Sequence, residues 1–180
     1  MDAARDIRNL ALVGFMGTGK STVGRQVARD LHFEFVDTDA LIEDQAGVSI
    51  PEIFSQSGEE EFRRMERDVV AGLAQREKLV IATGGGLVAD PANVEALRAH
   101  SLVVCLWANP ETIWQRCRGQ THRPLLNDPD PQARIRELLD AREPYYRQAD
   151  IIISTDIRPQ REVVSQVTHQ FRETGRGSQK

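Results

Sequence analysis

Short apolar runs alternate with amphipathic stretches along the chain. Runs of strand length occupy residues 10–13, 34–37, 79–83, 102–107 and 151–154. Between and after them, apolar residues recur at helical spacing, which predicts helices over residues 20–31, 39–46, 58–76, 91–99, 110–118, 131–147 and 159–173. Strands that alternate with helices are typical of a parallel sheet covered by helices on both faces. The pattern therefore predicts an α/β fold around a five-stranded parallel sheet.

The helix predicted over residues 58–76 has the clearest signals. Ser57 can cap its first turn, and Glu60 follows three residues later, as in a capping box. A stripe of apolar residues at helical spacing predicts its buried face: Phe62, Met65, Val69 and Leu73. Arg63 and Arg64 fall off this stripe.

Length and composition predict a single domain that spans residues 1–180. The formal net charge of −4 argues against a nucleic-acid partner. No apolar stretch reaches the length of a membrane span, so we expect no membrane partner. The two cysteines fit the reducing cytoplasm, where we expect the protein to work. The polar tail at 174–180 is expected to be disordered.

Residues 14–21 read GFMGTGKS and fit the phosphate-binding pattern G-x-x-x-x-G-K-[ST], the P-loop. Glycines let successive backbone amides converge on phosphate oxygens. Lys20 can reach the outer phosphates, and the Ser21 hydroxyl suits Mg²⁺, which prefers oxygen ligands. The loop lies between a predicted strand and a predicted helix, whose positive end faces the phosphates. We therefore expect ATP phosphates to be bound by Gly17, Thr18, Gly19, Lys20, Ser21 and Thr22.

Two acidic residues follow the second predicted strand, where ligands of open parallel sheets bind. Asp37 and Asp39 alternate in an extended segment, so one can face a metal ion and the other a substrate. The third strand ends in three glycines and offers no acid, which makes Asp37 the candidate metal ligand, through water. The alternative is that the pair only caps a helix.

Gly84, Gly85 and Gly86, here called the glycine turn, end the third predicted strand. They permit close backbone contact with a ligand, although a plain turn is the alternative. The composition of residues 119–130 predicts a loop, which is long for a compact α/β unit and suits a lid. Arg123 in this loop can neutralise the charge of a phosphoryl group in transfer.

These motifs together resemble the shikimate kinase family, which belongs to the nucleoside monophosphate kinase branch of P-loop proteins. The resemblance covers residues 9–172. The segments that carry it are residues 14–21, Asp37-Thr38-Asp39, Glu61-Phe62-Arg63-Arg64, Gly84-Gly85-Gly86, Arg123-Pro124-Leu125-Leu126 and Arg142-Glu143-Pro144-Tyr145-Tyr146. The resemblance implies the sheet order 2-3-1-4-5, a substrate-binding region at about 39–67 and a lid at about 118–130.

The resemblance also implies an activity: ATP-dependent phosphorylation of the 3-hydroxyl of shikimate in aromatic amino-acid biosynthesis, with Mg²⁺ as cofactor. Asp39 would contact the substrate hydroxyls, and an aspartate of ordinary pKa is expected to suffice, because the loose transition state needs little basicity. Arg63 and Arg142 would hold the substrate carboxylate, and Gly85 would add a backbone contact. Two arginine forks on one carboxylate fix its orientation.

On the nucleotide side, the resemblance implies that Arg123 reaches the ATP phosphates from the lid. Arg116 would stack on adenine, and Arg158 would lie beside the base. The residues expected to act in catalysis are thus Lys20, Asp39 and Arg123. We expect a monomer.

Three other classes compete with this interpretation. The first alternative is a related small-molecule or nucleoside monophosphate kinase. The arginine pair expected to hold a carboxylate would distinguish a shikimate kinase from it. A regulatory GTPase would need an Asn-Lys-x-Asp element, and none occurs in the sequence. A nucleotide-binding module without catalysis is disfavoured because every motif above is present.

Overall fold

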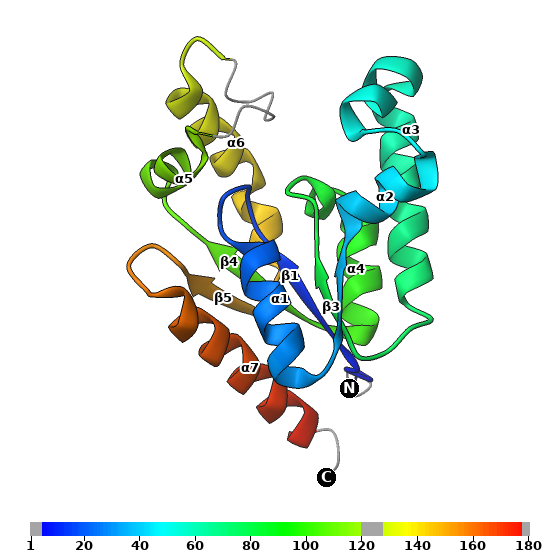
Figure 1. Ribbon diagram of the computed structural model, residues 1–180, viewed down its shortest axis with the longest axis vertical. Coiled ribbons are helices and arrows are strands. Elements are labelled where there is room, and N and C mark those ends of the chain that lie inside the picture. Colours follow the sequence, from blue (N-terminus) through cyan, green and yellow to red (C-terminus); the bar gives the residue numbers. More distant parts are fainter. Residues whose placement is uncertain (1–4, 120–127, 178–180) are drawn as a thin grey trace.

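The computed structural model describes residues 5–119 and 128–177. Five strands form one sheet: β1 (Asn9–Val13), β2 (Glu34–Asp37), β3 (Leu79–Ala82), β4 (Ser101–Trp107) and β5 (Ile151–Ser154). All neighbouring strands are parallel, and their order is β2-β3-β1-β4-β5 (Figure 1). The predicted sheet and its order are confirmed.

The helices that flank the sheet are α1 (Lys20–Leu31), α2 (Thr38–Ala46), α3 (Ile50–Leu73), the short 3₁₀ helix η1 (Leu87–Ala89), α4 (Pro91–His100), α5 (Pro110–Cys117), α6 (Pro131–Tyr146) and α7 (Gln160–Gly177). Residues of β1 alternate between the two faces of the sheet. Leu10 and Leu12 pack into the core beneath α1 and α7, whereas Ala11 and Val13 pack into the core on the side of α3, α4 and α6. Burial on both faces explains why the central strands are continuously apolar.

The helix α3 differs from its prediction. It begins at Ile50 rather than at residue 58, and its capping box is formed by Ser49 and Glu52, with 2.9 Å between the Ser49 amide nitrogen and Glu52 Oε2. Gly58 has a φ of 81° and a ψ of 177°, which are not helical angles, so α3 consists of two helical segments that meet at a kink there. The second segment follows Gly58, near the predicted helix start at residue 58, whereas the capping box of Ser49 and Glu52 starts an additional segment that was not predicted.

The chain ends also differ in part from expectation. The helix α7 continues through Gly177, four residues beyond the predicted end at residue 173. Residues 178–180, and residues 120–127 of the predicted lid, lie outside the described residues. Among the helices that the structure does describe, none is long and apolar enough to cross a membrane.

Candidate active site

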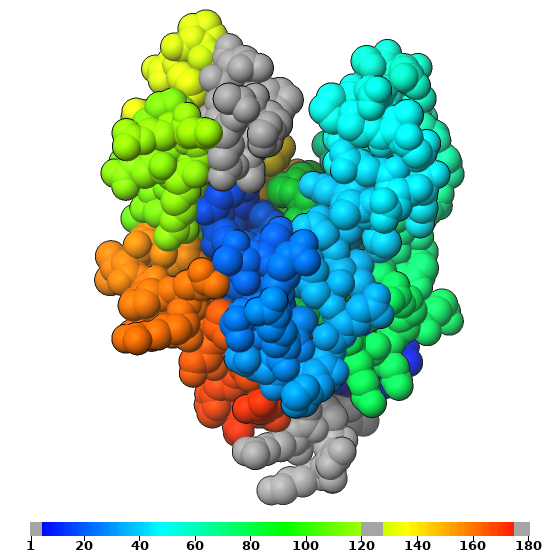
Figure 2. Space-filling model, in the orientation of Figure 1, coloured from blue at the N-terminus to red at the C-terminus, as the bar shows by residue number. Residues whose placement is uncertain are grey.

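A cavity of about 770 Å³ opens at the carboxyl ends of the strands. The space-filling view shows this face hollowed between the α2–α3 region and the P-loop segment (Figure 2). The cavity brings together every predicted site residue that lies in the described part of the chain: Gly17, Thr18, Gly19, Lys20, Ser21, Thr22, Asp37, Asp39, Arg63, Gly85, Arg116, Arg142 and Arg158. Arg123 lies outside the described residues. The individual roles assigned to these residues stay predictions.

The P-loop owes its shape to contacts within itself and with its neighbours. Gly14 and Gly17 have φ values of 136° and 73°, in the region that favours glycine. A Cβ at Gly14 would lie 2.3 Å from the Leu106 carbonyl oxygen, so no side chain fits there. Lys20 Nζ donates to the carbonyl oxygens of Gly14 and Phe15, at 2.7 and 2.9 Å. The ammonium group is thus held within the loop that is expected to bind phosphate.

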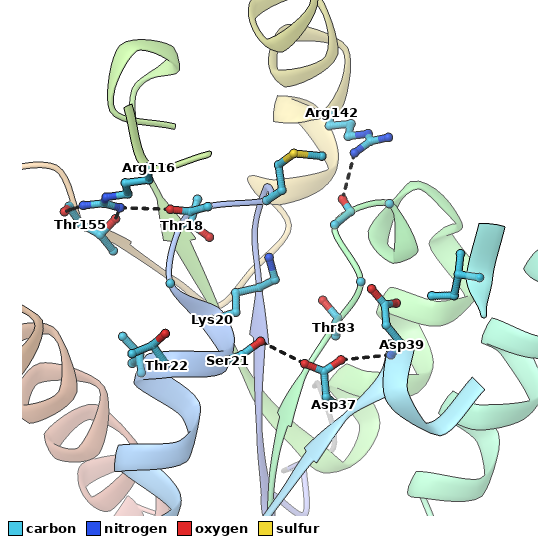
Figure 3. A pocket seen from close by; sticks show the side chains of 18 of the residues that line it. Thr18, Lys20, Ser21, Thr22, Asp37, Asp39, Thr83, Arg116, Arg142 and Thr155 are labelled. Carbon is cyan, nitrogen blue, oxygen red and sulfur yellow. Dashed lines mark hydrogen bonds between the residues drawn. The ribbon is translucent and has the colours of Figure 1, made fainter. Parts of the chain in front are cut away.

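Asp37 joins the P-loop helix to the end of β2. Its Oδ2 accepts a hydrogen bond from Ser21 Oγ at 3.0 Å, and its Oδ1 accepts one from the Asp39 amide at 3.1 Å (Figure 3). Asp37 therefore caps α2 and also faces the P-loop, so the two interpretations of this residue are compatible. A hydroxyl and a carboxylate that share one edge of the cavity fit a hard cation such as Mg²⁺.

Further ligands for such a cation would come from elsewhere. Within residues 5–119 and 128–177, no cluster of three or more His, Cys, Asp or Glu side chains could hold a metal ion by itself. Mg²⁺ at kinase sites keeps several waters and takes the remaining ligands from substrate phosphates. The observed pair fits that mode of binding.

Asp39 has an unusual electrostatic environment. Burial, and next the nearby Asp37 carboxylate, raise the pKa of Asp39 to about 6, while Lys20 opposes the shift. The sequence gives no sign of this shift, since it does not reveal how many acids surround the residue. A Cβ at Gly84 would lie 2.4 Å from Asp39 Oδ1, so the carboxylate occupies the space that this glycine leaves free.

Arg63 and Arg142 reach the glycine turn from two different helices. A Cβ at Gly86 would lie 3.3 Å from Arg63 Nη1 and 3.7 Å from Arg142 Nη2. The two guanidinium groups thus converge on one point of the turn, as a pair that holds a single carboxylate must. Arg63 is oriented by Glu66, whose Oε2 lies 2.7 Å from Arg63 Nη1.

Arg142 extends from α6 over the P-loop. Its Nη1 donates to the Gly85 carbonyl oxygen at 3.3 Å (Figure 3). Its Cζ lies 5.5 Å from the centre of the Phe15 ring. It makes no ion pair with any residue that the structure describes. Its charge is therefore available to an acidic ligand.

Arg116 and Arg158 border the opposite end of the cavity. Arg116 donates to the Thr155 carbonyl oxygen at 2.6 Å and to the Gly17 carbonyl oxygen at 3.3 Å, so it ties α5 to the P-loop and to the end of β5. Arg158 donates to the Gln166 side chain. Both residues line the same cavity as the P-loop.

Several residues that shape this cavity were not predicted from the sequence. Glu66 has a side chain that is 2% exposed, and its spacing of three from Arg63 is a helical ion-pair signal. Thr38 accepts a hydrogen bond from the Gly84 amide at 3.0 Å, and Tyr146 donates one to the Gly85 carbonyl at 2.7 Å. Both of these residues occur within quoted motifs, but no local spacing indicates their partners.

Comparisons with known proteins agree with this geometry. The sequence profile described as shikimate kinase matches residues 16–172. A shikimate kinase of Caldanaerobacter subterraneus subsp. tengcongensis is 46% identical over 165 residues, which make up 92% of this chain and 96% of that relative. The shikimate kinase of Symbiobacterium thermophilum is 48% identical over 170 residues, or 93% of this chain and 98% of the relative.

A solved structure supports the same assignment. The shikimate kinase from Acinetobacter baumannii in complex with shikimate has a TM-score of 0.87 and 39% identity, and covers 93% of this chain and 94% of its own. The resemblance inferred from the motifs is thereby confirmed, together with the enzyme class. The chain belongs to the shikimate kinase family and is a kinase.

Proposed function

We propose that this protein transfers the terminal phosphoryl group of ATP to the 3-hydroxyl of shikimate. One observation carries the proposal: two guanidinium groups converge on Gly86 in the same cavity as the P-loop and Asp39. The substrate then needs an acidic group at one end and a hydroxyl at the other. The shikimate bound to the Acinetobacter baumannii relative supports this choice of substrate.

We propose that Asp39 orients the reacting hydroxyl and accepts its proton. Its pKa of about 6 leaves it ionised at neutral pH, while making it a better base than an ordinary aspartate. The carboxylate of the substrate would lie between Arg63 and Arg142, with a backbone contact from Gly85. Positioning of this kind can supply roughly 7–11 kcal/mol of barrier lowering.

The nucleotide side of the proposal depends on the P-loop. Its amides and Lys20 would hold the β- and γ-phosphates, with Gly17, Thr18, Gly19, Ser21 and Thr22 around them. Mg²⁺, held by Ser21 and by Asp37 through water, would neutralise charge on the phosphates when it is bound. Arg116 and Arg158 would border the adenine, and the motif around Arg123 supports a lid arginine at the phosphates.

We propose the following organisation: one kinase domain over residues 1–180 with its core at 9–172, a substrate-binding region at about 39–67 and a lid at about 118–130. We also propose a cytoplasmic monomer without nucleic-acid or membrane partners. The formal net charge of −4 supports the absence of a nucleic-acid partner. Size-exclusion chromatography at several concentrations tests the monomer.

The activity is tested by coupled measurement of ADP release with and without shikimate. We expect release that depends on shikimate, ATP and Mg²⁺ together. The related kinases are tested in the same assay with AMP, CMP and gluconate as acceptors. Turnover with one of these acceptors but none with shikimate would overturn the proposal.

A further inference from the structure

The glycine turn is held from both sides by buried hydroxyl groups. On one side, Thr38 Oγ1 accepts the Gly84 amide hydrogen at 3.0 Å. On the other, Tyr146 Oη donates to the Gly85 carbonyl oxygen at 2.7 Å. Tyr146 is 1% exposed, and its ring packs edge-on against Trp107 with 6.4 Å between centroids. The tyrosine is thus fixed by packing, and its hydroxyl has one defined direction.

The hydroxyl of Tyr146 is a reliable donor. Burial raises the pKa of Tyr146 above its ordinary value, so the phenol keeps its proton throughout the neutral range. The only other donor to the Gly85 carbonyl among the described residues is Arg142, at the longer distance of 3.3 Å. Arg142 and Tyr146 are four residues apart on α6 and therefore lie on one face of this helix.

Fixing this carbonyl also fixes the amide that follows it. The peptide between Gly85 and Gly86 is planar, so an anchored carbonyl oxygen sets the direction of the Gly86 N–H. Within the described part of the chain, neither the Gly85 amide nor the Gly86 amide donates a hydrogen bond to another residue. Both glycines line the cavity, where Arg63 and Arg142 converge. These amides are therefore available donors beside the arginine pair.

Without its anchor, the peptide would be free to rotate. Glycines accept nearly the whole range of backbone angles, so nothing intrinsic to the turn prevents a flip of the Gly85–Gly86 peptide. A flip would turn the Gly85 carbonyl oxygen away from Tyr146 and Arg142 and would reverse the direction of the Gly86 N–H. It would also remove the acceptor that holds Arg142 in place.

We propose that Tyr146 is a positioning residue for the acidic end of the substrate: by holding the Gly85 carbonyl, it keeps the Gly85–Gly86 peptide and Arg142 in the orientation that binds the carboxylate. The proposal rests on the proposed function, since it concerns how shikimate is held. It predicts that loss of the Tyr146 hydroxyl weakens binding of shikimate and leaves binding of ATP unchanged. The nucleotide is expected at the P-loop, across the cavity from this residue.

The test replaces Tyr146 by phenylalanine, which removes one oxygen and keeps the ring. We expect the KM for shikimate to rise about three- to tenfold, the effect of one lost hydrogen bond. The kcat and the KM for ATP should stay within about twofold, because the contact is equally strong in the ground state and the transition state.

Tyr145→Phe is the matched control. Tyr145 is the adjacent, half-buried tyrosine of α6, and its hydroxyl makes no hydrogen bond within the described residues. All three constants should be unchanged in this control.

Calorimetric titration with shikimate guards against partial unfolding of the variant. Unfolded molecules lower the number of shikimate sites measured per chain. The proposal instead requires a larger dissociation constant for shikimate at the sites that remain. An unchanged dissociation constant for shikimate in Tyr146→Phe would overturn the role of Tyr146 while leaving the proposed function intact. Equal losses of affinity for shikimate and for ATP would do the same. A wild-type protein that releases no ADP with shikimate would remove both.

Discussion

The hydroxyl of Ser21 lies 3.0 Å from a carboxylate oxygen of Asp37, across the gap between the first turn of α1 and the end of β2. This contact joins the two elements expected to share Mg²⁺. We therefore predict that Asp37→Asn raises the Mg²⁺ concentration for half-maximal activity about 10- to 100-fold, the usual effect of losing an outer partner of a bound metal.

Titration of activity with Mg²⁺ at saturating ATP and shikimate checks this prediction. Glu34→Gln offers a control, because Glu34 is an exposed acid of the same strand whose partner is Arg76, away from the cavity. An Asp37→Asn protein with the Mg²⁺ requirement of the wild type would exclude Asp37 from the metal site.

The pKa of Asp39 predicts the acid limb of the pH profile. Burial and the neighbouring Asp37 raise this pKa to about 6 in the free enzyme. Since the ionised form must accept the proton of the hydroxyl, kcat/KM for shikimate should fall about tenfold for each pH unit below 6. The profile between pH 5 and 8 gives the measurement. A flat profile down to pH 5 would contradict the assignment of Asp39 as the base.

The same residue should reduce the stability of the fold at neutral pH. A carboxyl whose folded-state pKa is raised binds more protons in the folded than in the unfolded chain between about pH 4 and 6, so stability falls as the pH rises through this window. Asp39→Asn should therefore raise the Tm at pH 7 by several degrees and lower kcat by about 10²- to 10⁴-fold. Near pH 4 the difference in Tm should vanish. A Tm below that of the wild type at pH 7 would count against this account of the site.

Arg63 and Glu66 form a pair in which only the arginine is expected to touch substrate. Arg63→Ala should raise the KM for shikimate about 100-fold, because two charge-assisted hydrogen bonds are lost. It should also lower the Tm, since the Glu66 side chain is 2% exposed and would lose its partner. The double variant Arg63→Ala/Glu66→Gln removes the buried charge. It should recover part of the Tm while the KM stays high, which separates binding from stability. Recovery of the KM as well would contradict a direct contact between Arg63 and the substrate.

Gly84 leaves the space that Asp39 occupies. A methyl group there would come within 2.4 Å of Asp39 Oδ1, so Gly84→Ala should displace the carboxylate and lower kcat by about 100-fold. Gly72→Ala is the control, because no atom lies within 4 Å of a Cβ at this helical position. That variant should keep full activity and gain stability of up to about 1 kcal/mol from its better helix propensity. Steady-state kinetics and thermal denaturation of both variants check the prediction, and an active Gly84→Ala protein would contradict it.

Features that depend on short spacings were predictable from the sequence. The P-loop pattern between a strand and a helix, and the alternation of strands and helices, were located correctly, because each is encoded within a few consecutive residues. The extended segment expected at Asp37 and Asp39 was wrong, since Asp39 lies in the first turn of α2. The first segment of α3 was not predicted, since it lies before the kink at Gly58 and begins with its own capping box at Ser49 and Glu52.

The sequence by itself determined which chemical groups this protein has and in what order the chain presents them. Only the tertiary structure decided which groups meet: Tyr146 with Gly85, 61 residues apart, and Thr38 with Gly84, 46 residues apart. It also decided the pKa of Asp39, which depends on the burial and the acids that the fold gathers around it. Hydrogen-bond partners and local dielectric are properties of positions in space, so a linear pattern cannot specify them until the sheet has brought distant segments to one edge.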